Sequence, residues 1–131
     1  MPHIIIEYST NVADHHDVDA LVTTIHETAK ATSIGPLGGL RTRAAAREQY
    51  RIADGHADNA MVAIIARLGP GREPEEKTAF IGMVLDAAEA QVATENSPLV
   101  IAWSMEVQEI DAQLRVNRNH VAARLRAETT K

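Results

Sequence analysis

The apolar residues of the chain follow two alternating spacings, one typical of strands and one typical of helices. Three isoleucines and a tyrosine predict a strand at residues 3–8, because β-branched and aromatic side chains suit a pleated, buried surface. Residues 11–16 are polar and predict a loop. From about Asp17, apolar residues recur three and four positions apart, which predicts a helix with one buried side, ending near Ser33. The apolar face of this helix consists of Val18, Leu21, Val22, Ile25 and Ala29.

The second half of the chain repeats this order. Residues 57–68 contain an apolar run that predicts a strand, and the Gly-Pro-Gly-Arg sequence at residues 69–72 predicts a turn. A helix follows, with Pro74 at its first position and carboxylates at the positive end of its dipole. Residues 99–107 carry a large apolar side chain at every second position, the mark of a half-buried strand. The predicted apolar face of the second helix consists of Ile81, Val84, Leu85, Ala88 and Val92.

Residues 40–50 are ambiguous on local preference, because the alanines at 44–46 suit a helix. The repeat favours a strand, since the two halves are offset by roughly 55 to 58 residues and each then has the order strand, helix, strand. Two βαβ units, at about residues 2–50 and 57–107, predict one α+β domain. It consists of a four-stranded mixed sheet with two helices on one face.

The other face of this sheet has no predicted cover. An apolar sheet face is not left in water, so we expect subunits to pack around these faces, burying the strand rows that include Trp103 and Met105. The tail at residues 109–131 contains a short extended piece at 114–116 and one or two helical turns around 121–125. We expect this tail to be an oligomerisation arm that contacts a neighbouring subunit.

Composition narrows the class of partner and compartment. A formal net charge of -5 over 131 residues argues against nucleic acid as the partner, and the apolar runs are far shorter than a membrane span. The absence of cysteine and of a signal segment predicts a cytoplasmic protein. The histidines have no metal-ligand spacing, since His15 and His16 are adjacent in a predicted loop. We therefore expect no metal and no cofactor.

Two features of this acidic chain indicate chemistry on an anionic small molecule. Four arginines cluster at positions 41, 43, 47 and 51, and a proline directly follows Met1. If Met1 is removed, Pro2 provides a secondary amine at the end of a strand. Free α-amino groups titrate near pH ~7.7 to 8.0, and burial with nearby cations lowers the pKa of an amine toward the range that a general base requires. The alternative is that Pro2 merely opens an edge strand, where its missing N–H is harmless.

Five short segments carry a resemblance that spans nearly the whole chain. They are residues 2–7 (PHIIIE), 31–43 (ATSIGPLGGLRTR), 53–55 (ADG), 69–72 (GPGR) and the tail around 117–125. Their order and spacing resemble the tautomerase superfamily, and within it the 5-carboxymethyl-2-hydroxymuconate isomerase family of the 4-oxalocrotonate tautomerase type. This resemblance implies a trimer and a delta-isomerase activity, an intramolecular oxidoreduction that needs no cofactor.

The resemblance also implies roles for particular residues. Pro2 corresponds to the catalytic base, and Arg41 and Arg72 correspond to the arginines that hold the substrate carboxylates, with Arg43 as a weaker candidate. Guanidinium groups suit this role because they bind carboxylates through two parallel hydrogen bonds and stabilise developing negative charge. For each arginine the alternative is a solvated charge at a strand edge, which we favour for Arg47 and Arg51.

Three functions remain open on the sequence alone. The first is isomerisation of 5-carboxymethyl-2-hydroxymuconate in homoprotocatechuate (4-hydroxyphenylacetate) degradation. The second is tautomerisation of another unsaturated dicarboxylic or phenylpyruvate-like substrate. The third is a binding or signalling role, because the superfamily that the chain resembles includes macrophage migration inhibitory factor. The pairing of Pro2 with Arg41 and Arg72 favours the enzymes.

Overall fold

The computed structural model describes residues 2–129 and contains the two predicted βαβ units. Met1 and the last two residues of the predicted arm lie outside the described residues. The first unit consists of β1 (His3–Ser9), α2 (Val18–Thr32) and β2 (Arg41–Arg47). The second unit consists of β3 (Asn59–Leu68), α3 (Pro74–Ala93) and β4 (Val100–Glu109). The ambiguous segment at residues 40–50 is therefore a strand, as the repeat predicts.

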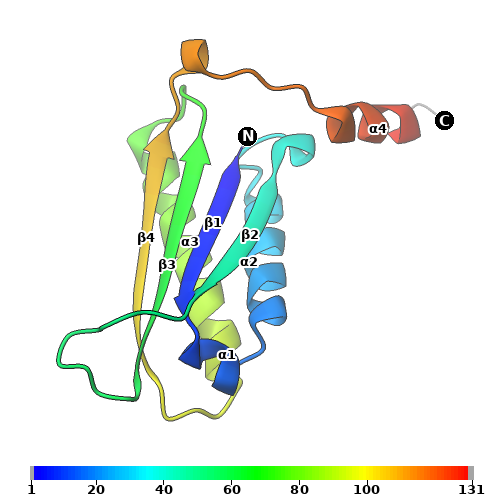
Figure 1. Ribbon diagram of the computed structural model, residues 1–131. Helices are drawn as coiled ribbons and strands as arrows, with labels where there is room; N and C mark the ends of the chain where they lie inside the picture. Colours follow the sequence, from blue (N-terminus) through cyan, green and yellow to red (C-terminus); the bar gives the residue numbers. More distant parts are fainter. Residues whose placement is uncertain (1, 130–131) are drawn as a thin grey trace.

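The four strands form one sheet in the order β2-β1-β3-β4 (Figure 1). The strands within each unit are parallel, and the two units meet at an antiparallel pairing of β1 with β3. Helices α2 and α3 lie together on one face, which confirms the predicted α+β architecture. Because β1 is an interior strand, Pro2 does not open an edge strand, and that alternative is wrong. The starts of β1 and β2 and the ends of β3 and β4 share the upper edge in Figure 1.

The core lies between the sheet and the two helices. The fully buried side chains of α2 are those of its predicted face, at Leu21, Ile25 and Ala29. In α3 the buried face is rotated, since Phe80, Val84 and Ala88 are buried whereas the predicted Ile81 is half-buried. Phe80 is the largest fully buried side chain of the described chain, and Phe80, Val84 and Ala88 follow at intervals of four residues and form a continuous stripe.

Trp103 and Met105 lie on the face that the helices cover. Their partners in β3 are Val62 and Ile64, both buried in the core, and both side chains pack against that core. Side chains of directly paired residues on adjacent strands point to the same face of the sheet. Trp103 and Met105 therefore point toward the helices and away from the uncovered face. The prediction that subunit contacts bury Trp103 and Met105 is therefore wrong.

The uncovered face differs from the one predicted, because it is apolar only at its centre, at Ile5 of β1 and along the middle of β3. Ile5 pairs with Ile65 at the centre, and Met61 and Ala63 continue the apolar row along β3. On β2 the same face carries arginines, and on β4 it is mostly small or polar. The uncovered residues of β4 are Val100, Ala102, Ser104, Glu106 and Gln108.

Residues 11–15 form a short helix, α1 (Asn11–His15), so the predicted loop is wrong. The reason is Val12, whose side chain is completely buried and anchors the turn against the core.

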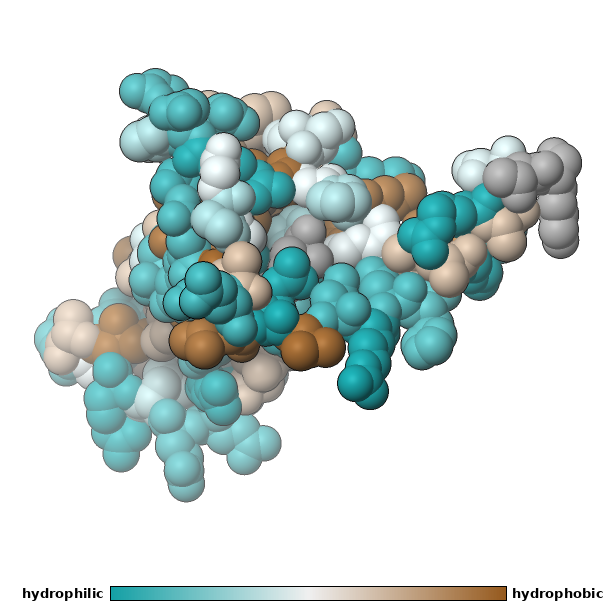
Figure 2. All heavy atoms as spheres, turned by 90° about the horizontal axis from the view of Figure 1, so that it is seen from above, coloured by the Kyte–Doolittle hydropathy of each residue, from teal (hydrophilic) through white to brown (hydrophobic). Residues whose placement is uncertain are grey.

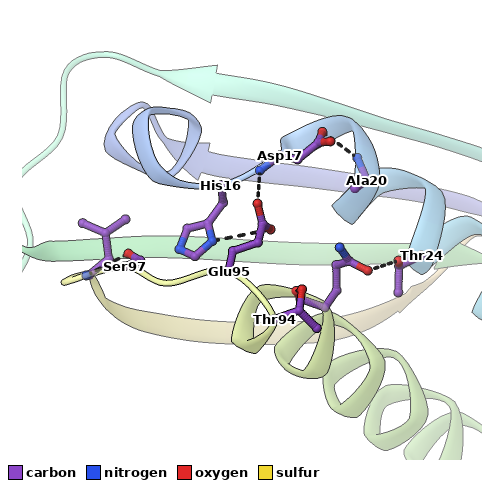
Figure 3. Close-up of polar contacts among 9 residues, drawn as sticks. His16, Asp17, Ala20, Thr24, Thr94, Glu95 and Ser97 are labelled. Carbon is purple, nitrogen blue, oxygen red and sulfur yellow. Dashed lines mark hydrogen bonds and ion pairs between the residues drawn. The ribbon is translucent and has the colours of Figure 1, made fainter.

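At the lower end of the sheet, Glu95 joins the two helices (Figure 3). One carboxylate oxygen accepts a hydrogen bond from the backbone N–H of Asp17 at 2.8 Å, and the other lies 3.6 Å from Nδ1 of the buried His16. Figure 3 shows that Asp17 in turn caps α2 by accepting from the N–H of Ala20.

The tail contains a 3-10 turn, η2 (Ala112–Leu114), and then a helix, α4 (His120–Thr129), which is longer than the predicted turns. It crosses above the upper edge of the sheet, and α4 extends to the side of β2 (Figure 1). Every helix within residues 2–129 is too short or too polar to span a bilayer.

Helix α4 is held against a second 3-10 turn, η1 (Leu37–Gly39), of its own chain. The Asn119 side chain donates to the Gly38 carbonyl at 2.6 Å and accepts from the N–H of Ala122 at 3.0 Å, so it caps α4 and ties it down. A Cβ atom at Gly38 would lie 2.8 Å from that of Ala122. Only glycine allows this approach, which explains one position of the glycine-rich segment.

Candidate active site

Pro2 and Arg41 meet at the upper edge of the sheet. The parallel register of β1 and β2 places Arg41 directly beside His3, and the carbonyl of Pro2 accepts a hydrogen bond from the N–H of Arg41 at 3.0 Å. Pro2 is fully buried in the described chain. The predicted base and one predicted carboxylate-binding arginine therefore come from adjacent strands and lie at the same end of the sheet.

His3 lies between two guanidinium groups, which it contacts with both of its ring nitrogens. Nη1 of Arg41 is 2.9 Å from Nε2, and Nη1 of Arg43 is 3.0 Å from Nδ1. Nη2 of Arg41 also donates to Oδ1 of Asn117, in the tail, at 3.4 Å. The three side chains of this His3 cluster, His3, Arg41 and Arg43, project from the face of the sheet that the helices leave uncovered.

The surroundings of His3 favour its neutral form. Partial burial is the main cause that lowers the pKa of His3, followed by the positive charges of Arg41 and Arg43 on β2 and of Arg67 on β3. Arg67 is the direct partner of His3 in the antiparallel pairing. The sequence alone gives no signal for His3, because strand pairing is what places its imidazole among three arginines.

Arg72 lies apart from the His3 cluster, in the turn that follows β3. Its Nε donates to the carbonyl of Ile34 at 2.5 Å and its Nη1 donates to the carbonyl of Gly69 at 3.0 Å. These bonds tie the turn after β3 to the glycine-rich segment after α2. Within residues 2–129 the second terminal nitrogen of the guanidinium has no hydrogen-bond partner, so Arg72 has donors for a ligand as well as a structural role.

A hollow of about 810 Å³ lies between η1 and α4 and opens at this edge. Leu37 and Leu125 provide apolar walls, and the cationic side chains that line it are Arg72, Arg115 and Arg126. Asn117 lines the hollow and also bonds to Arg41, so the hollow adjoins the His3 cluster. Figure 2 views this edge from above and shows a largely hydrophilic surface from which α4 projects. An anion with an apolar body suits such a site.

The other two arginines of the sequence cluster are engaged elsewhere. Arg47 is at the opposite end of β2 and forms an ion pair with Glu7 at 3.1 Å. Arg51 donates to the carbonyl of its neighbour Tyr50. Of the four clustered arginines, Arg41 and Arg43 are thus the two that the structure brings to the N-terminal end of β1.

Comparisons with known proteins agree with this fold. The family model for 5-carboxymethyl-2-hydroxymuconate isomerase matches residues 2–125. The 5-carboxymethyl-2-hydroxymuconate Delta-isomerase of Escherichia coli is 31% identical over 123 residues, which cover 94% of this chain and 98% of the relative.

Two solved structures share the architecture. The 5-carboxymethyl-2-hydroxymuconate isomerase from Deinococcus radiodurans R1 superposes with a TM-score of 0.84 at 25% identity, over 95% of this chain and 93% of that one. A fused 4-OT symmetric trimer superposes with a TM-score of 0.63 at 15% identity, over 88% of this chain and 93% of that one, and shows the fold alone.

The family model extends across the βαβ repeat, the glycine-rich turn and most of α4. It includes the upper-edge residues Pro2, His3, Arg41 and Arg72. With a relative at 31% identity over almost its full length, the chain belongs to the 5-carboxymethyl-2-hydroxymuconate isomerase family.

Proposed function

We propose that this protein is a cofactor-independent isomerase that moves a double bond in an unsaturated 2-hydroxy or 2-oxo dicarboxylic or tricarboxylic acid. The proposed substrate is 5-carboxymethyl-2-hydroxymuconate, in the degradation of homoprotocatechuate (4-hydroxyphenylacetate). The observation that carries the proposal is the hydrogen bond that joins Pro2 to Arg41 at the upper edge of the sheet. It joins the backbone of Pro2 to that of Arg41, whose guanidinium belongs to the cationic His3 cluster, and the family relationship supports the same chemistry.

In the proposed reaction the amine of Pro2, freed by removal of Met1, is the general base. The neutral nitrogen takes the proton from the 2-hydroxyl group, and the electron pair moves into the conjugated system to form a dienolate. The protonated nitrogen then returns the proton to a carbon at another position of that system. No atom or charge is gained overall, so one base is sufficient for both proton transfers.

The arginines supply binding and charge stabilisation. Arg41 and Arg72 are proposed to hold carboxylates of the substrate and to stabilise the dienolate, with Arg43 as an additional binding group. Their positive charges also favour the neutral form of a nearby amine, and so lower its pKa toward the working pH. The apolar walls of the hollow provide a low-polarity environment, in which these electrostatic interactions are stronger.

The function is tested by ultraviolet absorbance of purified protein mixed with 5-carboxymethyl-2-hydroxymuconate. We expect the absorbance of the conjugated enol to change at a rate proportional to enzyme concentration, without added metal and in the presence of a chelator. Boiled protein gives the background rate, and 2-hydroxymuconate, which lacks the carboxymethyl group, reports the contribution of the third carboxylate. A rate no greater than that of boiled protein with both substrates would refute the proposed function.

We propose further that the protein is a homotrimer with active sites at the subunit boundaries and with residues 109–131 as its arm. The apolar centre of the uncovered face, around Ile5 and Ile65, provides a surface for a neighbouring subunit. The arm exposes large apolar side chains in the single chain: Leu114 is 84% exposed and Val116 is 82% exposed. Strands β2 and β4 each have one unpaired edge, which a neighbour's extended segment is able to cover.

Leu114→Glu tests the trimer with little risk to the fold, because the side chain is exposed in the single chain. We expect the substitution to raise the concentration at which the oligomer dissociates by about tenfold or more, since it places a charge in an apolar contact. Sedimentation equilibrium measures the change. Met83→Glu, on the outer side of α3 with 51% exposure, is the matched control and should leave the oligomeric state unchanged. A wild-type protein that sediments as a monomer at micromolar concentration would refute the proposed trimer.

A further inference from the structure

The His3 cluster contains a conflict between donors and acceptors. Guanidinium groups only donate hydrogen bonds, so both Arg41 and Arg43 require a lone pair on the ring nitrogen that each contacts. A neutral imidazole has one lone pair and one N–H, and a protonated imidazole has two N–H groups. At most one of the two contacts is therefore a hydrogen bond, and the other places N–H against N–H.

We propose that His3 is a positioning residue that holds Arg41 through Nε2 and presents its Nδ1–H, together with Arg43, to a second carboxylate of the substrate. The inference rests on the proposed function, because it assigns a part of the same site. The proton is placed on Nδ1, so that the lone pair on Nε2 accepts from Arg41 and the unsatisfied pair of donors is His3 Nδ1 and Arg43 Nη1.

The neighbouring contacts favour this assignment over the reverse one. Arg41 is held from two sides, by His3 and by Asn117, whereas the guanidinium of Arg43 has its one close polar contact, with His3, among residues 2–129. A guanidinium fixed by two acceptors is preorganised, which suits the group that must meet the reacting end of the substrate. Arg43 is the group that is free to move when an anion arrives.

A carboxylate resolves the conflict, because its oxygens accept from both donors at once. Two N–H groups directed at the same space are a poor contact in the empty site and a good one around an oxygen anion. His3 remains able to do this because its surroundings keep the ring uncharged. The site therefore distinguishes substrates by the number of their carboxylates, and we expect it to prefer an elongated dicarboxylate to a monocarboxylate of the same length.

Calorimetric titration with trans,trans-muconate and with sorbate tests this preference. Both probes are six-carbon dienoates, and they differ in that a methyl group of sorbate replaces one carboxylate. We expect wild-type protein to bind muconate about tenfold or more tightly than sorbate, the scale of one charge-assisted pair of hydrogen bonds. Equal affinities, or binding of neither probe, would overturn the inference.

Substitutions assign the preference to His3 and Arg43. In His3→Gln the side-chain oxygen has two lone pairs and accepts from both guanidiniums, so the ratio of the two affinities should fall to within about twofold of unity. Arg43→Gln should do the same, whereas Arg47→Gln, on the same face but paired with Glu7, should retain the wild-type ratio. A merely structural role for His3 would weaken both probes equally and leave the ratio unchanged, which contradicts the proposal.

Nitrogen-15 NMR of the imidazole gives a readout that is independent of affinity. In the free protein we expect the His3 ring to carry its proton on Nδ1, with a lone pair on Nε2, and we expect the Nδ1 signal to shift on addition of muconate. A proton on Nε2 would assign Arg43 as the held arginine and overturn the proposal. If the wild type shows the muconate preference but no isomerase activity, the proposed function fails and the role of His3 stands. If the wild type is an active isomerase but binds muconate and sorbate equally, the proposed function stands and the role of His3 fails.

Discussion

Replacing Arg41 by alanine should raise the activation free energy of the isomerisation by about 2 to 4 kcal/mol, which lowers kcat by roughly 30- to 10³-fold. The Arg41 side chain is held by His3 and Asn117 at the same end of the sheet as Pro2, so in the proposed reaction it is fixed near the charge that develops in the dienolate. Loss of a donor that acts in the transition state lowers kcat and kcat/KM together. Steady-state kinetics of the variant measures both.

Arg47→Ala is the matched control, because Arg47 lies on the same strand and the same face but at the far end, paired with Glu7. We expect its kinetic constants to remain within about twofold of wild type, since exposed ion pairs contribute little.

Arg72→Ala should lower kcat on the same scale as Arg41→Ala. It should also lower Tm, because the two backbone carbonyls that Arg72 joins lose their donor. Unchanged kinetics for both Arg41→Ala and Arg72→Ala would refute the assignment of these arginines.

A chain that retains Met1 should lose activity by about 10²- to 10⁴-fold, the contribution of a positioned general base. With Met1 in place the nitrogen of Pro2 belongs to an amide and has no basic lone pair. The test compares a protein that begins at Pro2 with one that carries an uncleaved N-terminal extension, and intact mass identifies the N-terminus of each sample. Full activity in a sample whose mass includes Met1 would eliminate Pro2 as the base.

Pro2→Ala gives a milder form of the same experiment. It leaves a primary amine at the same position, so we expect lower turnover with an unchanged circular dichroism spectrum. Pro98→Ala is the control, because this exposed proline lies in the loop before β4 at the opposite edge of the sheet. Its turnover should match that of wild type.

Most of the fold was predictable because α2 and β4 have clear hydrophobic periods and because the repeat identifies β2, whose own sequence is ambiguous. The face of the sheet on which Trp103 and Met105 lie was not predictable, although the alternation of apolar residues along β4 was correctly identified. Which face the helices cover depends on the register with β3, and β3 is apolar along most of its length, so its own pattern does not distinguish the faces. The rotated face of α3 has a similar cause, because Phe80 and Ile81 are both apolar and only packing selects Phe80.

The candidate site was predictable in part. Pro2 and Arg41 are recognisable from their positions in the sequence, and the register of β1 with β2 brings them together. His3 was not recognisable, because a single histidine has no periodic or spacing signal and gains its significance from Arg41, Arg43 and Arg67 on two other strands. The contact of Gly38 with Ala122 was equally inaccessible, since it joins segments more than eighty positions apart in the chain.

The antiparallel join between the two βαβ units places the starts of their first strands at opposite edges of the sheet. The bond from the N–H of Arg41 to the carbonyl of Pro2 has a counterpart in the second unit, where the N–H of Val100 donates to the carbonyl of Asp58 at 2.8 Å. Because β3 runs opposite to β1, this counterpart lies at the lower edge, where Asp58 is an interior residue and Val100 stands in the position of Arg41. The second half thus repeats the scaffold without an arginine at this position, and the proposed site occurs once per polypeptide.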